Sequence, residues 1–156
     1  MRISLATVDD INNIQSFINS EWKKNHILSQ NLSFFKYEYL YDNKVNFLLA
    51  KVNDEIHGVI GFIPNSIYNK ESYSCIADKS DYCATLWKVK KNSIYPSLGL
   101  QLLQALRDLD QKRKLFCVGI NEETLGLYKY LDIYTDKMSH YVMINSQKTF
   151  FKIAKI

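Results

Sequence analysis

The sequence predicts an α/β fold, of the α+β kind, in which helices flank one mixed sheet. Residues 45–63 read as a hairpin of two apolar strands, and residues 82–120 read as a strand, a helix and a second strand. A hairpin pairs its strands antiparallel, whereas two strands joined by a crossover helix run parallel. The sheet is therefore expected to contain both kinds of pairing. A length of 156 residues favours one domain, residues 1–156, with a single core.

The expected order of elements is strand, two helices, three strands, helix, strand, helix and two strands. Their predicted ranges are Arg2–Ala6, a helix from Thr7 to near Ser20, helix Phe34–Tyr41, strands Val45–Val52, Ile56–Ile63 and Tyr82–Val89, a helix from Ser97 to about Asp110, strand Lys114–Ile120, a helix from Asn121 to Tyr130 or Leu131, and strands Tyr134–Ile144 and Phe150–Ile156. Residues 21–33 and 65–81 are expected to be irregular.

Local patterns support these helices and the hairpin. Thr7-Val8-Asp9-Asp10 approximates a capping box at the start of the first helix. Asn53-Asp54-Glu55 forms the hairpin turn. Gly58 and Gly61, inside the second hairpin strand, predict a β-bulge or a close backbone approach. Apolar residues at helical spacing are Val8, Ile11, Ile14, Phe17 and Ile18 in the first helix, and Leu98, Leu102, Leu103, Leu106 and Leu109 in the helix after Ser97.

Composition excludes several classes of partner. The net charge of +4 permits an anionic ligand but does not require nucleic acid. No apolar run approaches the ~20 residues of a membrane span, and no secretory signal is seen. Cys75, Cys83 and Cys117 form no metal-binding spacing, and buried free thiols fit a cytoplasmic protein. We therefore expect no nucleic acid, no membrane and no metal.

Residues 82–109 carry the main functional signal. The apolar strand Tyr82–Val89 leads through a polar connection into a Pro96-Ser97-Leu98-Gly99 turn and a Leu-rich helix. The free N–H groups in the first turn of a helix carry partial positive charge and favour a phosphate. We interpret this segment as a diphosphate-binding site.

With these elements in view, the chain resembles the GNAT superfamily of acyl-CoA-dependent N-acyltransferases over nearly its whole length. LWKVKKNSIYPSLGLQLL, residues 86–103, is similar to that family's acetyl-CoA motif, in which an apolar strand precedes an (Arg/Gln)-x-x-Gly-x-(Gly/Ala) turn. Ile94, Ser97 and Gly99 hold those three positions, and only Gly99 keeps the family residue. Ser97 asks more of the backbone than glycine, and Pro96 lacks an N–H but suits a first helical turn.

A second landmark is INEETLGLYKYLDI, residues 120–133. It resembles the family's Asn…Leu-Tyr-x-x-x-Gly-Phe segment through Asn121, Leu127 and Tyr128, whereas Asp132 and Ile133 replace Gly-Phe. The resemblance implies that Tyr128 protonates the departing thiolate as a general acid.

The resemblance also implies acetyl-CoA as the acyl donor, and a mostly antiparallel sheet. The parallel strands ending at Val89 and beginning near Leu115 would splay apart and admit the pantetheine arm. Lys88, Lys90 and Lys91 are candidates to add positive charge there, or are solvated surface lysines. The cofactor-binding residues that it implies are Trp87, Val89, Tyr95, Ser97, Leu98, Gly99, Leu100, Asn121 and Tyr128.

The sequence also offers candidate residues for the general base and for binding the acceptor. The strand Tyr82–Val89 holds no carboxylate that could serve as base, so His26, Asp81, Glu38 and His140 are candidates. His26 titrates near neutrality and, with Trp22, is expected to bind the acceptor, although core packing remains the alternative for the aromatic residues. EWKKNHIL, the aromatic helix and NFLLAKVNDEIHGVIGFIP also resemble a GNAT subgroup of bacterial surface-polysaccharide biosynthesis. That resemblance implies that the acceptor is a small molecule with a primary amine, namely a nucleotide-linked amino sugar.

Two other functions stay open. A degenerate GNAT fold that binds CoA or a partner without catalysis would account for Ile94, Pro96 and Ser97. An interaction domain would account for the 11 Tyr and 8 Phe residues. Homodimers are common in the resembled family, and nothing in the sequence fixes one.

Overall fold

The computed structural model describes residues 1–65, 81–111, 114–139 and 141, and it divides into two compact units, residues 1–119 and 120–156. Cys75, His140 and the strand expected at Phe150–Ile156 lie outside the described residues. The second unit contains helix α5 (Glu122–Tyr130). All the other helices and strands described below belong to the first unit.

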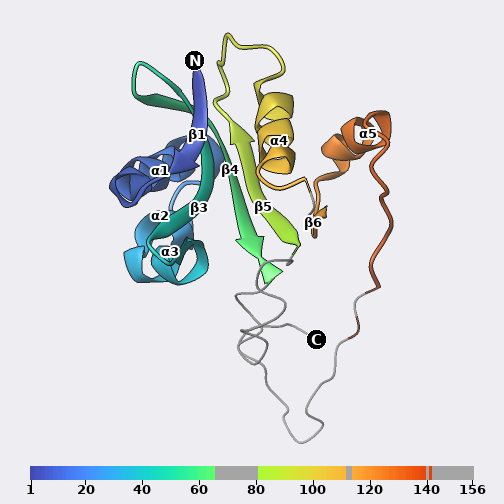
Figure 1. The fold of residues 1–156 in the computed structure, drawn as a ribbon, viewed down its shortest axis with the longest axis horizontal. Helices are drawn as coiled ribbons and strands as arrows, with labels where there is room; N and C mark the ends of the chain where they lie inside the picture. Colours follow the sequence, from blue (N-terminus) through green and yellow to red (C-terminus); the bar gives the residue numbers. More distant parts are fainter. Residues whose placement is uncertain (66–80, 112–113, 140, 142–156) are drawn as a thin grey trace, which may run out of the picture. The chain divides into compact units, whose positions relative to one another are not determined.

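The first unit contains a six-stranded sheet in the order β1-β3-β4-β5-β6, with β2 paired to β3 (Figure 1). The β5/β6 pair is parallel, and the other pairs are antiparallel. The predicted mixed, mostly antiparallel sheet is therefore confirmed. The strands are β1 (Arg2–Ala6), β2 (Leu40–Tyr41), β3 (Lys44–Val52), β4 (Glu55–Pro64), β5 (Tyr82–Val89) and β6 (Leu115–Cys117).

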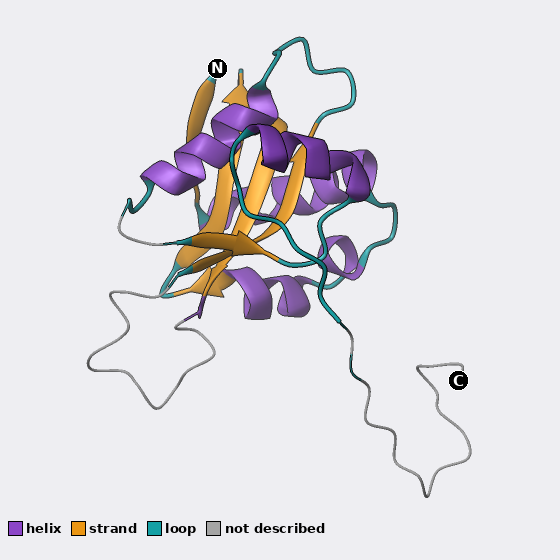
Figure 2. Cartoon of the chain, turned by 90° about the vertical axis from the view of Figure 1, so that its right-hand side faces the viewer, coloured by secondary structure: helices purple, strands orange, loops and turns teal. Residues whose placement is uncertain are grey.

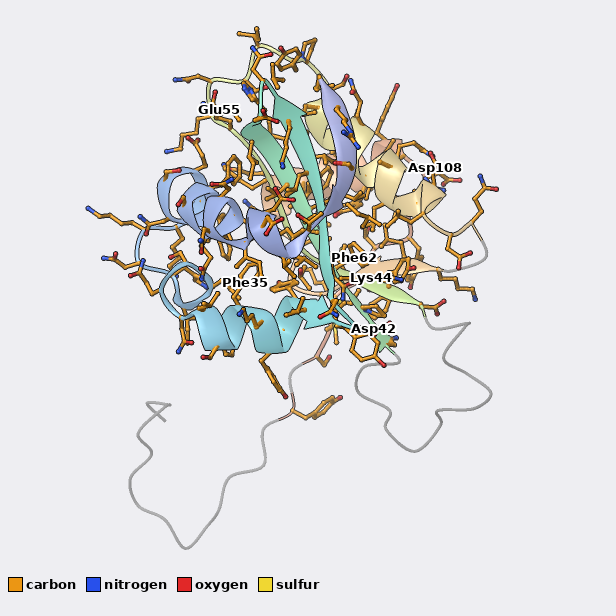
Figure 3. All side chains as sticks on the ribbon, turned by 60° about the vertical axis from the view of Figure 1, so that its left-hand side comes forward. Phe35, Asp42, Lys44, Glu55, Phe62 and Asp108 are labelled. Carbon is orange, nitrogen blue, oxygen red and sulfur yellow. The ribbon has the colours of Figure 1, made fainter. Side chains whose placement is uncertain are left out.

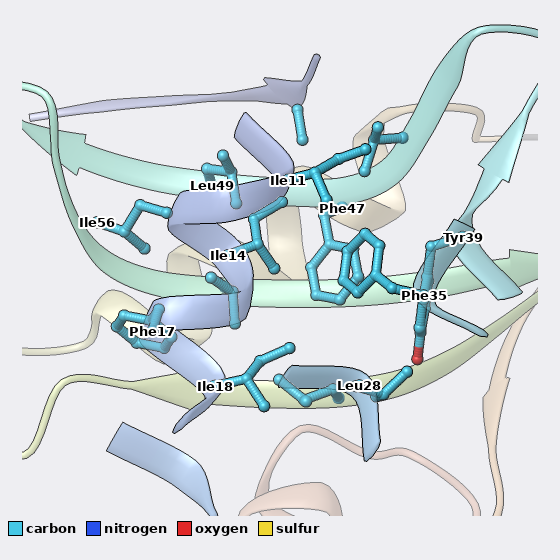
Figure 4. Close-up of a cluster of buried hydrophobic side chains, with 14 of the residues drawn as sticks. Ile11, Ile14, Phe17, Ile18, Leu28, Phe35, Tyr39, Phe47, Leu49 and Ile56 are labelled. Carbon is cyan, nitrogen blue, oxygen red and sulfur yellow. The ribbon is translucent and has the colours of Figure 1, made fainter. Parts of the chain in front are cut away.

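Helices pack on both faces of this sheet, whose strands are orange in Figure 2. One face carries α1 (Ile11–Phe17), α2 (Ile27–Gln30) and α3 (Leu32–Tyr39), and α4 (Leu98–Asp108) contacts β3, β4 and β5 from the other. The side chains between the sheet and α1–α3 form a buried hydrophobic cluster (Figure 4), whose members include Ile14, Phe35, Phe47, Leu49 and Leu86. Four leucines of the predicted stripe, Leu98, Leu102, Leu103 and Leu106, are buried in α4, whereas Leu109 lies past the end of that helix and is exposed.

Asp10 ties the first helical segment to the sheet. Its carboxylate accepts the Thr7 N–H at 2.9 Å, as the capping box requires, and forms an ion pair with Lys51 of β3. Burial alone would raise the pKa of Asp10, but the hydrogen bonds from Lys51 and Thr7 outweigh it and lower that pKa. The ionised carboxylate thus anchors the start of α1 against β3.

Both glycines of β4 behave as predicted. A Cβ on Gly58 would lie 2.9 Å from Leu102 of α4, so this glycine permits the close approach of that helix. Gly61 lies at a β-bulge, where Ile60 pairs with Trp87 and Phe62 pairs with Ala84. The hairpin turn is also confirmed, since Asn53 and Asp54 have φ of 48° and 65° and Val52 pairs with Glu55.

Several predicted elements differ from the structure. The first helix is divided into a 3₁₀ turn, η1 (Val8–Asp10), then α1, then a π-helical turn, η2 (Ile18–Trp22). Residues 21–33 were expected to be irregular but contain α2 and the start of α3. Tyr134–Ser139 form no strand, and β6 is only three residues long. A strand needs a neighbour to pair with, and no described strand pairs with Tyr134–Ser139.

Replacing Gly61 by alanine should destabilise the fold by about 1–3 kcal/mol. The added Cβ would lie 2.9 Å from the Phe47 ring and 3.0 Å from Thr85 Oγ1. Chemical denaturation measures the effect. Gly126→Ala is the control, because nothing lies within 4 Å of that position and alanine favours a helix. Unchanged stability of Gly61→Ala would contradict the packing described here.

Candidate functional site

Strands β5 and β6 pair over only three residues. Tyr82 pairs with Leu115, Cys83 with Phe116 and Ala84 with Cys117, whereas β5 continues to Val89. The ladder stops where β6 ends, and the two strands separate beyond Ala84. The strand–helix–strand pattern predicted the parallel pairing, and the family resemblance implied that the two strands splay apart.

A β-bulge lies at the point of separation. Between the pairs Ile60–Trp87 and Phe62–Ala84, both Thr85 and Leu86 face the single residue Gly61. An extra residue bends the strand that carries it and increases its local twist. The bulge therefore changes the direction of β5, so that its second half no longer runs alongside β6.

Beyond the bulge, the backbone of Val89 points to the β6 side. The Lys90 N–H donates to the His57 carbonyl oxygen at 2.8 Å, and Val89 lies opposite Gly58. In an antiparallel ladder this makes Val89 and Gly58 a non-hydrogen-bonded pair. The N–H and C=O of Val89 consequently point away from β4. An extended ligand could pair with that edge as an added strand.

The first turn of α4 is held against β5. The Trp87 indole Nε1–H donates to the Gly99 carbonyl oxygen at 3.1 Å, and a Cβ on Gly99 would lie 3.4 Å from the Trp87 ring. Gly99 thus permits this contact. The N–H groups of Leu98, Gly99 and Leu100 lie in the first turn of α4, where a helix offers no internal acceptors.

Ser97 occupies a left-handed backbone conformation, with φ of 60° and ψ of 11°. That conformation strains any residue with a side chain, which accounts for the glycine at this position of the family motif. Helix α4 still starts normally, because the Gln101 N–H donates to the Ser97 carbonyl oxygen at 3.0 Å. Ile94, which stands in place of the family's Arg/Gln, is 81% exposed and therefore packs little against the rest of the chain.

The lysines after the bulge differ in what they contact. Lys90 forms an ion pair with Glu55 at the β3–β4 turn, labelled in Figure 3. The hydrogen bond between them lowers the pKa of Glu55 and raises that of Lys90. Lys91 donates its backbone N–H to Glu21 Oε2 at 3.2 Å, which holds η2 beside the segment that follows β5. The positive charge of Lys90 is therefore directed to a carboxylate.

Trp22 and His26 lie together, with ring centroids 4.6 Å apart. His26 Nδ1 accepts the Leu28 N–H at 3.3 Å and caps α2. Burial, followed by the charge of Lys23, lowers the pKa of His26 below its ordinary value. The imidazole is therefore neutral at neutral pH. Asp81, another candidate base, accepts the Lys114 N–H at 2.9 Å, and Glu38 is half-buried on α3.

The second unit contains Asn121 and Tyr128. Asn121 Oδ1 caps α5 by accepting the Glu123 N–H at 3.3 Å, and Tyr128 is buried. The Ile133 N–H donates to the Tyr128 carbonyl oxygen, and the Asp132 N–H donates to the Lys129 carbonyl oxygen.

These two bonds form a Schellman motif, in which Asp132 takes the left-handed position with φ of 53°. The residue that replaces glycine in this landmark therefore keeps the backbone turn that glycine favours.

The described part of the chain contains neither a candidate metal site nor a candidate membrane-spanning helix. No group of three or more His, Cys, Asp or Glu side chains could hold a metal ion there. Likewise, no helix in that part has the length and apolar character needed to cross a membrane.

Comparison with solved structures identifies the fold. Over 92% of this chain it matches 93% of an aminoglycoside N-acetyltransferase in complex with CoA, with a TM-score of 0.66 and 11% identity. It matches a ribosomal-protein-alanine N-acetyltransferase from Brucella melitensis biovar Abortus 2308 over 93% of this chain and 100% of that one, with a TM-score of 0.59 and 16% identity. The chain has the fold of these acetyltransferases.

A longer protein of Pyrococcus horikoshii, assigned as an acetyltransferase, matches 84% of this chain with a TM-score of 0.61 and 20% identity. The present chain spans 42% of that protein. No protein-family model matches the sequence, and no curated protein matches it significantly.

Sequence reasoning missed one polar position. Thr85 is exposed in the middle of β5, between the buried residues Ala84 and Leu86, and its Oγ1 lies 2.9 Å from the Tyr39 hydroxyl. A hydroxyl inside an otherwise apolar strand was the available signal. Its partner, 46 residues earlier, is identified only by the fold.

Replacing Ser97 by glycine should stabilise the protein by about 1 kcal/mol, or roughly 2–4 °C in melting temperature. Glycine adopts the left-handed conformation without the steric cost of a side chain, although its unfolded chain is more flexible. Thermal unfolding measures the shift. Ser93→Gly should have the opposite sign, because Ser93 Oγ accepts the Tyr95 N–H at 3.3 Å. A destabilised Ser97→Gly variant would contradict the strain argument.

Replacing His26 by alanine should lower the free energy of unfolding by about 1 kcal/mol, because α2 loses its cap. His26→Asn should preserve most of that stability, since asparagine also caps helices. Denaturant titration of both variants measures the difference. Equal losses in the two variants would show that capping is not what His26 contributes to stability.

Proposed function

We propose that this chain is an acetyl-CoA-dependent N-acetyltransferase that moves the acetyl group directly to a primary amine of a small acceptor. The backbone of Val89, which points away from β4 beyond the bulge, is the observation that carries this proposal, because the same part of β5 contacts the first turn of α4 through Trp87. An extended arm and a diphosphate need these two features next to each other. The fold shared with a CoA-bound acetyltransferase supports the same donor.

In this proposal the donor lies along β5 and across the start of α4. The backbone groups of Val89 and Trp87 bind the pantetheine arm as a neighbouring strand would. The backbone N–H groups of Ser97, Leu98, Gly99 and Leu100 bind the diphosphate, whereas the Tyr95 N–H already donates to Ser93 Oγ. Pro96 contributes no N–H. The site therefore depends on backbone position, which tolerates Ile94 and Ser97 in place of the family residues.

The reaction is a direct transfer. The neutral amine nitrogen attacks the thioester carbonyl carbon, a C–N bond forms, and the C–S bond breaks. Tyr128 donates its proton to the departing thiolate, and a base removes the proton that the amine loses. Asn121 supports the segment that carries Tyr128 by capping α5. His26 is neutral and its Nδ1 accepts the Leu28 N–H, so Nε2 carries the ring proton. In this tautomer His26 donates a hydrogen bond to the acceptor, and solvent water takes up the proton of the amine.

For the acceptor we propose an amino sugar, nucleotide-linked in the manner of surface-polysaccharide precursors. The similarity to an aminoglycoside N-acetyltransferase supports an amine on a sugar ring. Trp22, which is 45% exposed and contacts His26, offers an aromatic face to such a ring.

Calorimetric titration with acetyl-CoA and with CoA tests the proposal first. We expect one-to-one binding near micromolar, or about −8 kcal/mol. Thiol release with a panel of amino sugars should then detect transfer, and Tyr128→Phe should reduce turnover by about 10²-fold or more while retaining acetyl-CoA binding. Normal turnover of Tyr128→Phe would remove Tyr128 from the mechanism.

The other outcomes separate the alternatives. CoA binding without transfer to any amine would favour a degenerate acetyltransferase fold that binds without catalysis. No binding of either ligand at millimolar concentration would overturn the proposal and favour an interaction domain.

A further inference from the structure

Two hydroxyl groups meet where β5 leaves β6. Thr85 Oγ1 and the Tyr39 hydroxyl lie 2.9 Å apart, and either atom can donate to the other. Thr85 directly follows Ala84, the last residue of β5 that pairs with β6. The hydroxyl pair therefore sits at the fork between the two strands.

Packing fixes the position of the Tyr39 hydroxyl. The Tyr39 ring is buried and lies 4.6 Å from the Phe47 ring and 5.4 Å from the Phe35 ring. Figure 4 shows its oxygen turned towards β5. A ring held on two sides keeps its hydroxyl in place, so Tyr39 sets the orientation of the Thr85 side chain.

The bulge exposes Thr85 on the face covered by α1, α2 and α3. Gly61 lies opposite, and a Cβ there would come within 3.0 Å of Thr85 Oγ1. The absence of that Cβ leaves room for the threonine side chain, which is exposed although its strand neighbours Ala84 and Leu86 are buried. Trp22 and His26 belong to the helical segments of this same face, and η2 contacts β5.

We propose that Thr85 contacts the acceptor amine and that Tyr39 positions Thr85 for this contact. The inference rests on the proposed N-acetyltransferase function and names a specificity-determining residue for it. If the pantetheine arm runs along β5 from Val89, its thioester end reaches the fork at Thr85. An acceptor on the α1–α3 face then meets the thioester beside this hydroxyl.

The chemistry of the pair favours an uncharged amine. One hydroxyl proton is used within the pair, which leaves lone pairs on Thr85 Oγ1 to accept an N–H from the acceptor. A hydroxyl forms no ion pair, so it gives an ammonium ion little of the stabilisation that a carboxylate would give. A neutral amine keeps the nitrogen lone pair that attacks the thioester. The site should therefore select weakly basic amines, such as those on sugar rings, over alkylamines.

Steady-state kinetics of Thr85→Val, with the best amino-sugar acceptor of the wild-type protein, tests this inference. We expect kcat/KM for the acceptor to fall about tenfold, mainly through KM, because one hydrogen bond is lost. The dissociation constant of acetyl-CoA should stay within twofold of wild type. Thr85→Ser should restore most of the activity, because it keeps the hydroxyl.

Tyr39→Phe should give a smaller loss, about threefold, since the Thr85 hydroxyl remains but is less well oriented. Tyr37→Phe makes the same change on the exposed side of α3, where Tyr37 is 76% exposed, and should have no effect. Thermal unfolding of each variant separates lost stability from lost acceptor binding.

Wild-type acceptor kinetics in both Thr85→Val and Tyr39→Phe would overturn the inference and leave the proposed function standing. Loss of acetyl-CoA binding in Thr85→Val would also overturn it, because the residue would then act on the donor. If the wild-type protein acetylates no amine, the proposed function fails and the inference fails with it.

Discussion

The β-bulge at Thr85 and Leu86 is the constraint on which the rest of the site depends. It places two residues of β5 opposite Gly61, and the parallel ladder with β6 ends at the same point. Gly61 is required there because Phe47 and Thr85 occupy the space that a side chain would need. Beyond the bulge, β5 stays hydrogen-bonded to β4 through Lys90 and His57 while Val89 points the other way. Beyond this irregularity in register, the N–H and C=O of Val89 are directed away from β4.

In the proposed reaction, the helices on the two faces of the sheet have different roles, one for the acyl donor and the other for the acceptor. Helix α4 reaches the end of β5 through the contact of Trp87 with Gly99, which brings the N–H groups of its first turn to the β5 edge. On the other face, α3 carries Tyr39 to Thr85 of β5, and η2, which contains Trp22, contacts β5. A donor bound along the edge and an acceptor bound from the α1–α3 face would meet at the fork. The residues that replace family glycines, Ser97 and Asp132, both keep the left-handed backbone that the turns require.

Much of this architecture could be predicted from local signals. The hairpin turn, the glycines of β4, the apolar stripe of α4 and the parallel β5/β6 pair all follow from patterns within about thirty residues. The short helices α2 and α3 could not, because their first turns depend on side-chain caps, in which His26 accepts the Leu28 N–H and Asn31 accepts the Phe34 N–H. The strand expected at Tyr134–Ile144 had the right composition, but Tyr134–Ser139 pair with no described strand. The Tyr39–Thr85 pair joins residues 46 apart, and only the register of the bulge brings them together.

Amide hydrogen exchange, followed residue by residue with and without acetyl-CoA, tests the central claim most directly. If the donor pairs with the open edge of β5, saturating acetyl-CoA should slow exchange of the Val89 N–H and of the N–H groups of Leu98, Gly99 and Leu100. The Lys90 N–H already donates to His57, so its protection should change little and serves as an internal reference. Unchanged exchange at Val89 in the acetyl-CoA-saturated protein would show that the edge created by the bulge is not the donor site.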